Sequence, residues 1–418
     1  MTVKRSAALN FVFITVLLDL MGIGIIIPIV PSLIQKLIGG NVADAGWYGG
    51  WLLFAYAIMQ FLFAPIIGGL SDRFGRRPVL LLSLLGLGVD YVFHALAPTI
   101  VWLFVGRLIA GAFGASYTTA KAYVADISVP EKRAQNFGLM GAAFGLGFII
   151  GPALGSFAFH WGLRAPFYMA AALSIVNMIY GYFVLPESLP KENRRKFELR
   201  RANPVGSLSQ LRKYPSITGL YVSIGLIFLA AQSVETSWPY FTMWKFSWSA
   251  SMVGYSLAFV GFLVAIVQGG LIRKAILQFG HKKSVIIGLV FNIVGLSLFT
   301  FAAKGWMMFA FVIPYCLGGI ASPAIQGIMS AQVSAREQGE LQGAVTSIRG
   351  LSAVIGPPLM NGLFYYFTRS SSAFKFPGIP FLTAAILILL SILVSRKSFS
   401  AFRFSMNENK SGPLPEVD

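Results

Sequence analysis

The sequence predicts an all-α membrane protein whose twelve transmembrane helices form two six-helix halves. Three observations support this fold class. Hydrophobic residues make up 56% of the chain and charged residues only 11%, against about 25% charged residues in soluble domains. The apolar segments reach the length of about 20 residues that a bilayer crossing needs. The two halves also share a pattern of glycine and proline positions.

The apolar segments, taken in chain order, define the expected spans. The segment Ala97-Pro98-Thr99 acts as a breaker and separates the third span from the fourth. The twelve expected spans cover residues 8–30, 47–70, 79–98, 100–125, 136–160, 164–185, 215–241, 250–272, 283–303, 305–330, 340–366 and 377–396.

A polar segment from Glu187 to Lys213 divides six spans from six. It carries eight Lys or Arg, and the prolines in and beside it argue against one continuous helix. We therefore expect four parts: an N-terminal six-helix bundle at 1–185, a cytoplasmic linker at 186–214, a C-terminal six-helix bundle at 215–397 and a cytoplasmic tail at 398–418.

The fifth span recurs in the eleventh. Four matches at one offset are difficult to attribute to chance, and parallel repeats of six spans are known in secondary transporters. With a shift of 205 positions, Gly138, Gly145, Gly151 and Pro152 correspond to Gly343, Gly350, Gly356 and Pro357.

The positive charges are distributed unevenly between the two sides of this topology. Of the 33 Lys and Arg, three lie inside spans and 24 lie on the side of the termini. Such a bias marks the cytoplasmic side, so we expect both termini there. The net charge of +18 therefore reflects membrane topology and not a nucleic-acid-binding surface. The six on the opposite side are Lys36, Arg164, Lys245, Lys304, Arg369 and Lys375.

Carboxylates inside the spans are the strongest candidates for a functional site, because a charge in hydrocarbon costs several kcal/mol unless it is paired or faces water. Asp19 and Asp90 each lie about eleven residues into their spans, near mid-depth at about 1.5 Å per residue. Glu235 lies in the seventh span, close to Pro239. Such a carboxylate can bind a proton from one side and release it to the other. The alternatives are a fixed ion pair for either aspartate and a pore-lip position for Glu235.

Cations and amides inside the spans are further candidates. Arg349 lies near mid-depth in the eleventh span and needs a carboxylate partner or an anionic ligand. Lys121 and Arg107 lie at the two ends of the fourth span, where Lys121 can also reach the interface by snorkelling. Besides Arg107, we predict these proton-coupling or substrate-binding residues: Asp19, Asp90, Glu235, Arg349, Lys121, Gln60, Gln268 and Asn292.

Two short motifs accompany these charges. The turn Gly68–Arg77 is glycine-broken and strongly basic, and it joins the second and third spans. In the fifth span, Gly147-x-x-x-Gly151-Pro152-x-x-Gly155 combines small residues at four-residue spacing, which let helices approach closely, with a proline bend. The three histidines show no metal-ligand spacing and no catalytic triad is present, so we expect no enzyme, no metal site and no bound cofactor.

The basic turn resembles the loop signature of the major facilitator superfamily. Several further stretches are similar to the tetracycline-resistance efflux proteins of bacteria, and the similarity covers roughly residues 8–396. It implies twelve helices, a bacterial inner-membrane location, and export of a drug in exchange for protons, with tetracycline travelling as a chelate with a divalent cation. These stretches are Leu18–Pro28, Asp90-Tyr91, Ala122–Ile127, Phe137–Met140 and Gly339–Gly343.

The resemblance also implies roles for individual residues. Asp19 and Asp90 match the acidic residues of the first and third spans. Gly147, Gly151, Pro152 and Gly155 match a motif associated with antiporters, which disfavours a symporter. A gating loop is implied at Gly68, Asp72, Arg73, Gly75, Arg76 and Arg77, with Asp126 as the partner of Arg76.

Three positions depart from this family. Asn292 replaces the acidic residue of the ninth span and cannot carry a proton. Lys121 stands where a small residue is usual, and Glu235 is an additional acid. We hypothesise that Glu235 takes over part of the role of the lost carboxylate.

The expected function is therefore a monomeric drug:proton antiporter in a lipid bilayer, with no nucleic-acid partner. Two alternatives remain open at this point. The first is transport of a metabolite, such as a siderophore or a sugar derivative, by the same fold. The second is a membrane receptor or scaffold that transports nothing.

Overall fold

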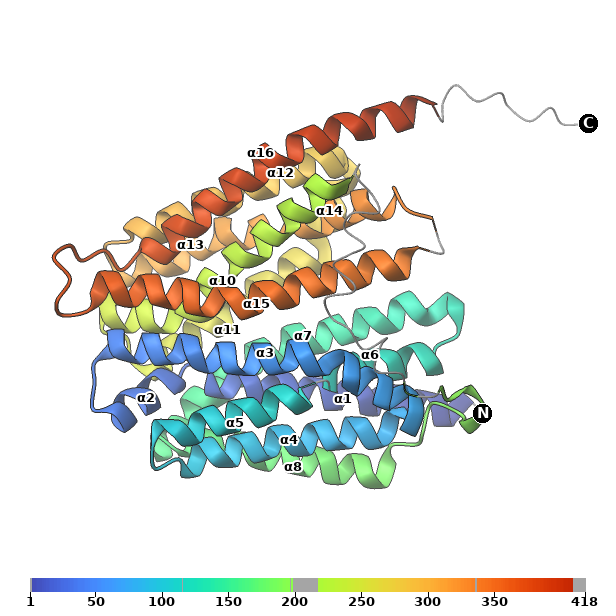
Figure 1. Cartoon of the computed structure of the whole chain (residues 1–418), viewed down its shortest axis with the longest axis horizontal. Helices are drawn as coiled ribbons and strands as arrows, with labels where there is room; N and C mark the ends of the chain where they lie inside the picture. Colours follow the sequence, from blue (N-terminus) through green and yellow to red (C-terminus); the bar gives the residue numbers. More distant parts are fainter. Residues whose placement is uncertain (1, 115, 196, 198–216, 335–336, 409–418) are drawn as a thin grey trace, which may run out of the picture.

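The computed structural model describes residues 2–114, 116–195, 197, 217–334 and 337–408 (Figure 1). Every regular element among these residues is a helix, and none of them forms a strand. The expected all-α fold is therefore confirmed. Figure 1 shows the blue-to-green and the yellow-to-red helices as two groups lying side by side, with both ends of the chain on the same side. We call this the termini side.

The first group contains the helices up to residue 184. They are α1 (Thr2–Ile26), α2 (Val30–Ile38), α3 (Val42–Phe74), α4 (Arg76–Leu96), α5 (Ile100–Phe113), α6 (Ser116–Ile127), α7 (Pro130–Ala158) with the 3₁₀ turn η1 (Phe159–Trp161), and α8 (Ala165–Val184). The predicted linker at 186–214 lies largely outside the described residues. Its described part contains one 3₁₀ turn, η2 (Lys191–Asn193).

The second group contains the helices from residue 218 onward. They are α10 (Thr218–Phe246), α11 (Ala250–Ile266), the π-helical η6 (Val267–Leu271), α12 (Ile272–Phe301), α13 (Gly305–Leu317), the 3₁₀ turn η7 (Gly318–Ile320), α14 (Ala321–Ser330), α15 (Gln338–Thr368) and α16 (Ile379–Glu408). α16 continues past residue 396, where the last span was expected to end. The rest of the predicted tail, 409–418, lies outside the described residues.

Nine helical stretches in the described part of the chain are long and apolar enough to cross a membrane. One of them, Ala250–Phe301, is 52 residues long and could cross twice at about 20 residues each. It bends at Gly280, whose φ of 71° lies in the left-handed region that glycine tolerates. The number of twelve membrane crossings stays a prediction.

Two expected spans depart from regular α-helix in the middle, at equivalent places in the two halves. The fourth is interrupted at Gly114, between α5 and α6, and the tenth tightens into the 3₁₀ turn η7 at Gly318, between α13 and α14. In both cases a side-chain amide from another helix donates to the glycine carbonyl: Gln60 Nε2 to Gly114 O at 2.7 Å and Asn292 Nδ2 to Gly318 O at 3.1 Å. These bonds satisfy backbone groups that a broken membrane helix would otherwise leave unpaired.

The glycines of the fifth-span motif bring α7 into direct contact with α1. A Cβ atom at Gly151 would lie 2.7 Å from Met21 O, and one at Gly155 would lie 2.2 Å from Ile25 O. Neither position leaves room for a side chain without moving one of the two helices. The motif therefore fixes the packing inside the first half, as small residues do in membrane helices generally.

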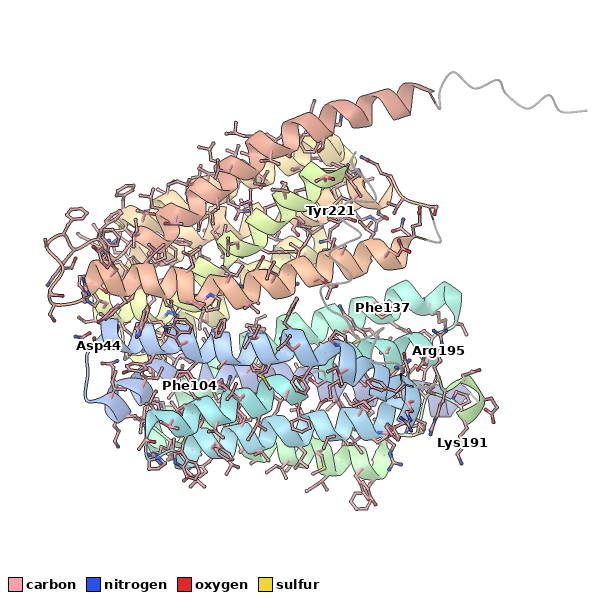
Figure 2. All side chains as sticks on the ribbon, viewed as in Figure 1. Asp44, Phe104, Phe137, Lys191, Arg195 and Tyr221 are labelled. Atoms are coloured by element: carbon pink, nitrogen blue, oxygen red, sulfur yellow. The ribbon has the colours of Figure 1, made fainter. Side chains whose placement is uncertain are left out.

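The two halves touch each other at the end far from the termini. A Cβ at Gly254 of α11 would lie 2.7 Å from Pro152 O of α7, and one at Gly50 of α3 would lie 2.9 Å from Pro357 O of α15. On the termini side, a Cβ at Gly138 of α7 or at Gly269 of η6 would meet no atom within 4 Å. Figure 2 shows Asp44 at the far end and Phe137 and Lys191 on the termini side. The close backbone approaches between the halves therefore lie at the far end, and these two glycines on the termini side take part in none.

The contact between α1 and α7 gives a test of this packing. Gly155→Ala should lower the stability of the purified protein by about 1–3 kcal/mol, because the added methyl group overpacks the contact. Gly138→Ala, on the same helix but with no neighbour within 4 Å, is the matched control. The apparent melting temperature in detergent measures both variants. Equal melting temperatures for the two variants would contradict the proposed packing role.

Candidate functional site

Asp90 of α4 lies in a buried ion pair. Both Arg107 of α5 and His94, one turn further along α4, contact its carboxylate. The Asp90 side chain is fully buried, and the Arg107 side chain is 13% exposed. An ion pair was the alternative expected for Asp90, and the structure contains such a pair, with Arg107 of the fourth span as the partner.

Asp19 of α1 lies in a different environment. Its Oδ2 atom accepts a hydrogen bond from Ser116 Oγ at 2.5 Å, and the residue is buried. No Lys or Arg in the described part of the chain lies within ion-pair distance of it. Tyr91 contributes a buried hydroxyl that has no hydrogen-bond partner among the described residues, close to Gly22 on the same helix as Asp19. A carboxylate held by one hydroxyl can gain or lose a proton without breaking an ion pair.

Glu235 of α10 is an acid within a span of the second half. It is exposed although most of its neighbours along α10 are buried, and Gln232 Nε2 donates to its Oε2 atom at 2.7 Å. Like Asp19, Glu235 has an uncharged hydrogen-bond donor, and no described cation forms an ion pair with it.

Asn292, predicted as a substrate or coupling residue, is buried and bound to the carbonyl of Gly318. Gln60 bonds to Gly114 O and also donates to Tyr56 Oη at 3.1 Å. Both amides therefore bond to the backbone at the point where a span departs from regular α-helix. Gln268 lies in the π-helical η6 and is exposed. A π-helical turn is often found at functional sites.

Lys121 of α6 and Arg349 of α15 come from opposite halves and are both exposed. The guanidinium group of Arg349 lies 5.5 Å from the ring centre of Phe228 on α10. Among the described residues, no carboxylate lies within ion-pair distance of Arg349.

The basic turn between α3 and α4 forms a chain of ion pairs. Arg76 contacts Asp72 Oδ1 at 2.5 Å and Asp126 Oδ2 of α6 at 3.1 Å, so the expected contact between Arg76 and Asp126 is present. Gly75 separates the two helices with a φ of 108°, in the region where L side chains are strained. By contrast, Gly68 has open space where its side chain would be.

Glu187, just after α8, joins the same network, although it is not among the site residues predicted from the sequence. Its carboxylate accepts the backbone N–H groups of Arg76 at 2.8 Å and Arg77 at 3.2 Å, at the first turn of α4. An acidic group at a helix N-terminus is stabilised by unpaired N–H groups and by the helix dipole. In the sequence, the only sign of this role is that Glu187 is an acid shortly after a span. Its partner Arg76 lies 111 residues earlier in the chain, so no local pattern links the two.

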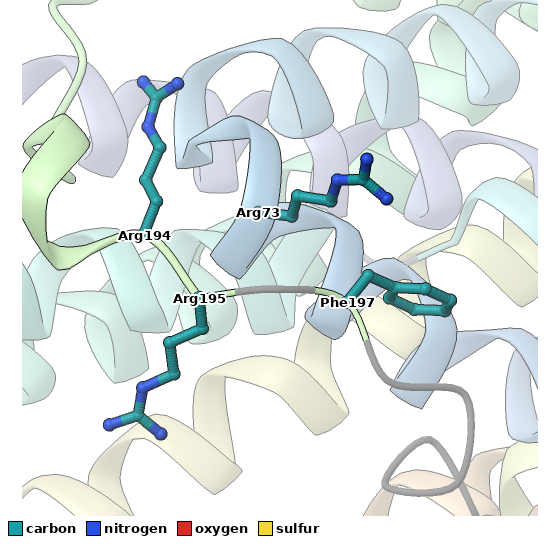
Figure 3. A pocket seen from close by; sticks show the side chains of 4 residues that line it. All are labelled: Arg73, Arg194, Arg195 and Phe197. Atoms are coloured by element: carbon teal, nitrogen blue, oxygen red, sulfur yellow. The ribbon is translucent and has the colours of Figure 1, made fainter.

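A pocket of about 360 Å³ lies beside this turn, lined by Arg73, Arg194, Arg195 and Phe197 (Figure 3). The Arg195 N–H donates to Asp72 O at 3.1 Å, so the start of the linker runs along the end of α3. Figure 3 shows the three guanidinium groups pointing in different directions. The three guanidinium groups therefore do not converge on a single anion. No group of three or more His, Cys, Asp or Glu in the described residues could hold a metal ion.

Comparisons with known proteins match this fold and these motifs. The sequence matches the family described as Major Facilitator Superfamily over residues 12–278 and 228–411. It is 39% identical over 394 residues to the tetracycline resistance protein, class C, of Escherichia coli, which covers 94% of this chain and 98% of that protein. It is 40% identical over 363 residues to the class E protein of the same organism, covering 86% and 88%.

Among solved structures, the fold is similar to that of the human organic anion transporter MFSD10 (TETRAN). The TM-score is 0.70 and the identity 23%, over 93% of this chain and 99% of that one. At this identity, the likeness supports the fold alone.

The ion pair of Asp90 makes a prediction about stability. Asp90→Asn should lower stability by about 3–5 kcal/mol, because it leaves the largely buried Arg107 without its carboxylate. The double variant Asp90→Asn/Arg107→Leu should recover most of that loss. Thermal unfolding of the purified variants in detergent measures both effects. If the Asp90→Asn variant were as stable as the unmodified protein, the ion pair would have no structural role.

Proposed function

The chain belongs to the major facilitator superfamily and to its family of tetracycline resistance proteins, and we propose that it exports a tetracycline-like drug in exchange for protons. It is a multi-pass membrane protein. Within the proposal, it lies in the bacterial inner membrane as a monomer, with both termini in the cytoplasm as the positive-inside pattern indicates. It is a transporter and not an enzyme, and a divalent cation enters only as part of the cargo.

The environment of Asp19 is the observation on which this proposal rests. It is a buried carboxylate in the middle of a membrane helix whose described hydrogen-bond partner is the hydroxyl of Ser116. Because no ion pair has to break, a proton can reach and leave Asp19 as the halves open on one side and then on the other. Asp90 is less suited to this step, since Arg107 holds its carboxylate in the charged form.

The position of the close contacts between the halves, which lie at the end far from the termini, supports the direction of transport. With the termini in the cytoplasm, the described conformation faces inward, where a drug would enter for export. Protonation of Asp19 would favour this inward-facing state. Release of the proton to the cytoplasm would then accompany drug binding, and closure of the termini side would bring the drug outward.

The contribution of Asp19 can be tested in liposomes with an imposed pH gradient. Tetracycline flux, with and without Mg²⁺, should be proton-coupled in the unmodified protein and fall at least tenfold in Asp19→Asn. Lys304→Gln is the matched control, because Lys304 is an exposed lysine at the far end. Failure of the unmodified protein to couple any amphiphilic drug to protons would contradict the proposed function.

Glu235 gives a second prediction under the same conditions. If it replaces the carboxylate lost at Asn292, Glu235→Gln should reduce pH-driven flux several-fold while the protein stays folded, because Gln232 can still bond to the new amide. The measurement is drug-dependent proton release. Unchanged pH-driven transport in Glu235→Gln would show that Glu235 has no coupling role.

A further inference from the structure

A pocket at the far end lies between the two halves and has no part in the proton step at Asp19. Its volume is about 330 Å³, within the range of about 300–1,000 Å³ that is usual for small-molecule sites. The end of α2, the start of α3 and the end of α15 enclose it, so both halves contribute. Figure 2 shows Asp44 at this end. The pocket is lined by Ile38, Gly40, Asp44, Trp47, Tyr48 and Tyr365.

Three aromatic side chains line this pocket. The ring centres of Trp47 of α3 and Tyr365 of α15 are 5.4 Å apart, with planes tilted by 36°, so the rings of the two halves meet here. Trp47 and Tyr48 remain 38% and 36% exposed, and a ligand can reach them from the far end. The face of an aromatic ring attracts cations, and aromatic pockets bind quaternary ammonium groups in this way.

Asp44 supplies the pocket with a negative charge. Its Oδ2 atom accepts the backbone N–H of Asn41 at 3.1 Å, as part of the capping box of α3. Within the described part of the chain, its Oδ1 atom accepts no hydrogen bond, and no Lys or Arg lies within ion-pair distance of the carboxylate. A side chain at Gly40 would crowd this group, since a Cβ there would lie 3.0 Å from Asp44 Oδ2. Between the expected spans, Asp44 is also the only acidic residue on the far side.

Tryptophan and tyrosine also gather at membrane interfaces without any ligand. Such a belt does not explain why a carboxylate without a cationic partner lies among the rings. Arg369, which follows α15, does not line the pocket. Its guanidinium carbon lies 4.9 Å from the ring centre of Tyr366 and 6.0 Å from that of Tyr365. The rings at the end of α15 thus already contact one cation, whereas Asp44 has none.

We propose that this pocket binds an amphiphilic organic cation, namely a protonated or quaternary amine with an apolar body. The ammonium group lies beside Asp44, and the apolar body packs against Trp47 and Tyr365. Because these two rings belong to opposite halves, the bound cation ties α3 to α15 at the far end. It therefore opposes the opening of that end.

Two soluble probes of similar size test the binding step. They are 4-fluorobenzyltrimethylammonium, which is a cation, and the neutral 4-fluorobenzyl alcohol. Fluorine NMR of the probes with the full-length purified protein in a neutral detergent should show roughly fivefold tighter binding of the cation. Asp44→Asn and Trp47→Leu should each weaken binding of the cation roughly threefold, and the double variant should lose the preference for it. Asp44→Asn keeps an oxygen that can accept the N–H of Asn41.

Trp306→Leu is the control for a general effect of interfacial aromatic residues. Trp306 begins α13 at the far end, is 64% exposed and does not line the pocket. This variant should retain the preference for the cation, and melting temperatures check that every variant is folded. Equal binding of the two probes to the unmodified protein, no measurable binding of the cation, or an equal loss in Trp306→Leu and Trp47→Leu would each overturn the proposal.

The effect on opening is measured as inhibition of drug flux, and this part rests on the proposed function. The cation, added on the side of the far end, should halve the flux near the concentration that half-saturates the pocket. Asp44→Asn should raise this concentration roughly threefold, in step with its weaker binding. An unchanged concentration in Asp44→Asn, or full flux with the pocket saturated, would overturn the effect on opening. Absence of flux without the cation would contradict the proposed antiport alone, because binding of the probes is measured without transport.

Discussion

A charged side chain inside a bilayer must have a partner or face water, and this constraint organises the whole protein. Asp90 meets it with Arg107 and His94, and is thereby held in one charge state. Asp19 and Glu235 meet it with the uncharged donors of Ser116 and Gln232. The same constraint therefore divides the acids of the spans into one that supports the fold and two that are suited to exchange protons.

Much of this arrangement could be predicted from the sequence, because it depends on local patterns. The length of the apolar segments predicted the helices. The contact between Arg76 and Asp126, by contrast, was implied by the family resemblance and not by any local pattern. The interruption at Gly114 and the 3₁₀ turn at Gly318 were not predicted, since hydropathy continues through both. At each of these positions the glycine carbonyl accepts a hydrogen bond from a side-chain amide of a distant helix, Gln60 or Asn292. Residue spacing along the chain does not reveal a contact of this kind. Glu187 was missed for the same reason.

The contacts of the basic turn also suggest how the two ends of the protein differ. Asp72, Arg76, Asp126 and Glu187 all belong to the first half or to the start of the linker, so the turn is fixed to its own half in this conformation. At the far end, close backbone approaches join the halves, as at Gly50 and Gly254. The halves can thus separate on the termini side while the ion pairs of the turn remain intact.

The central claim is that the proton on Asp19 controls which side of the protein is open. Spin labels can be attached at positions 142 and 269, which are exposed on opposite halves, in a protein with Cys316 replaced by Ser. The distance between the two labels, measured in nanodiscs by pulsed electron paramagnetic resonance, would report the separation of the halves on the termini side. The account predicts long distances at acidic pH, shorter ones at alkaline pH, and long distances at both in Asp19→Asn. An unaltered pH-dependent shift in Asp19→Asn would contradict it.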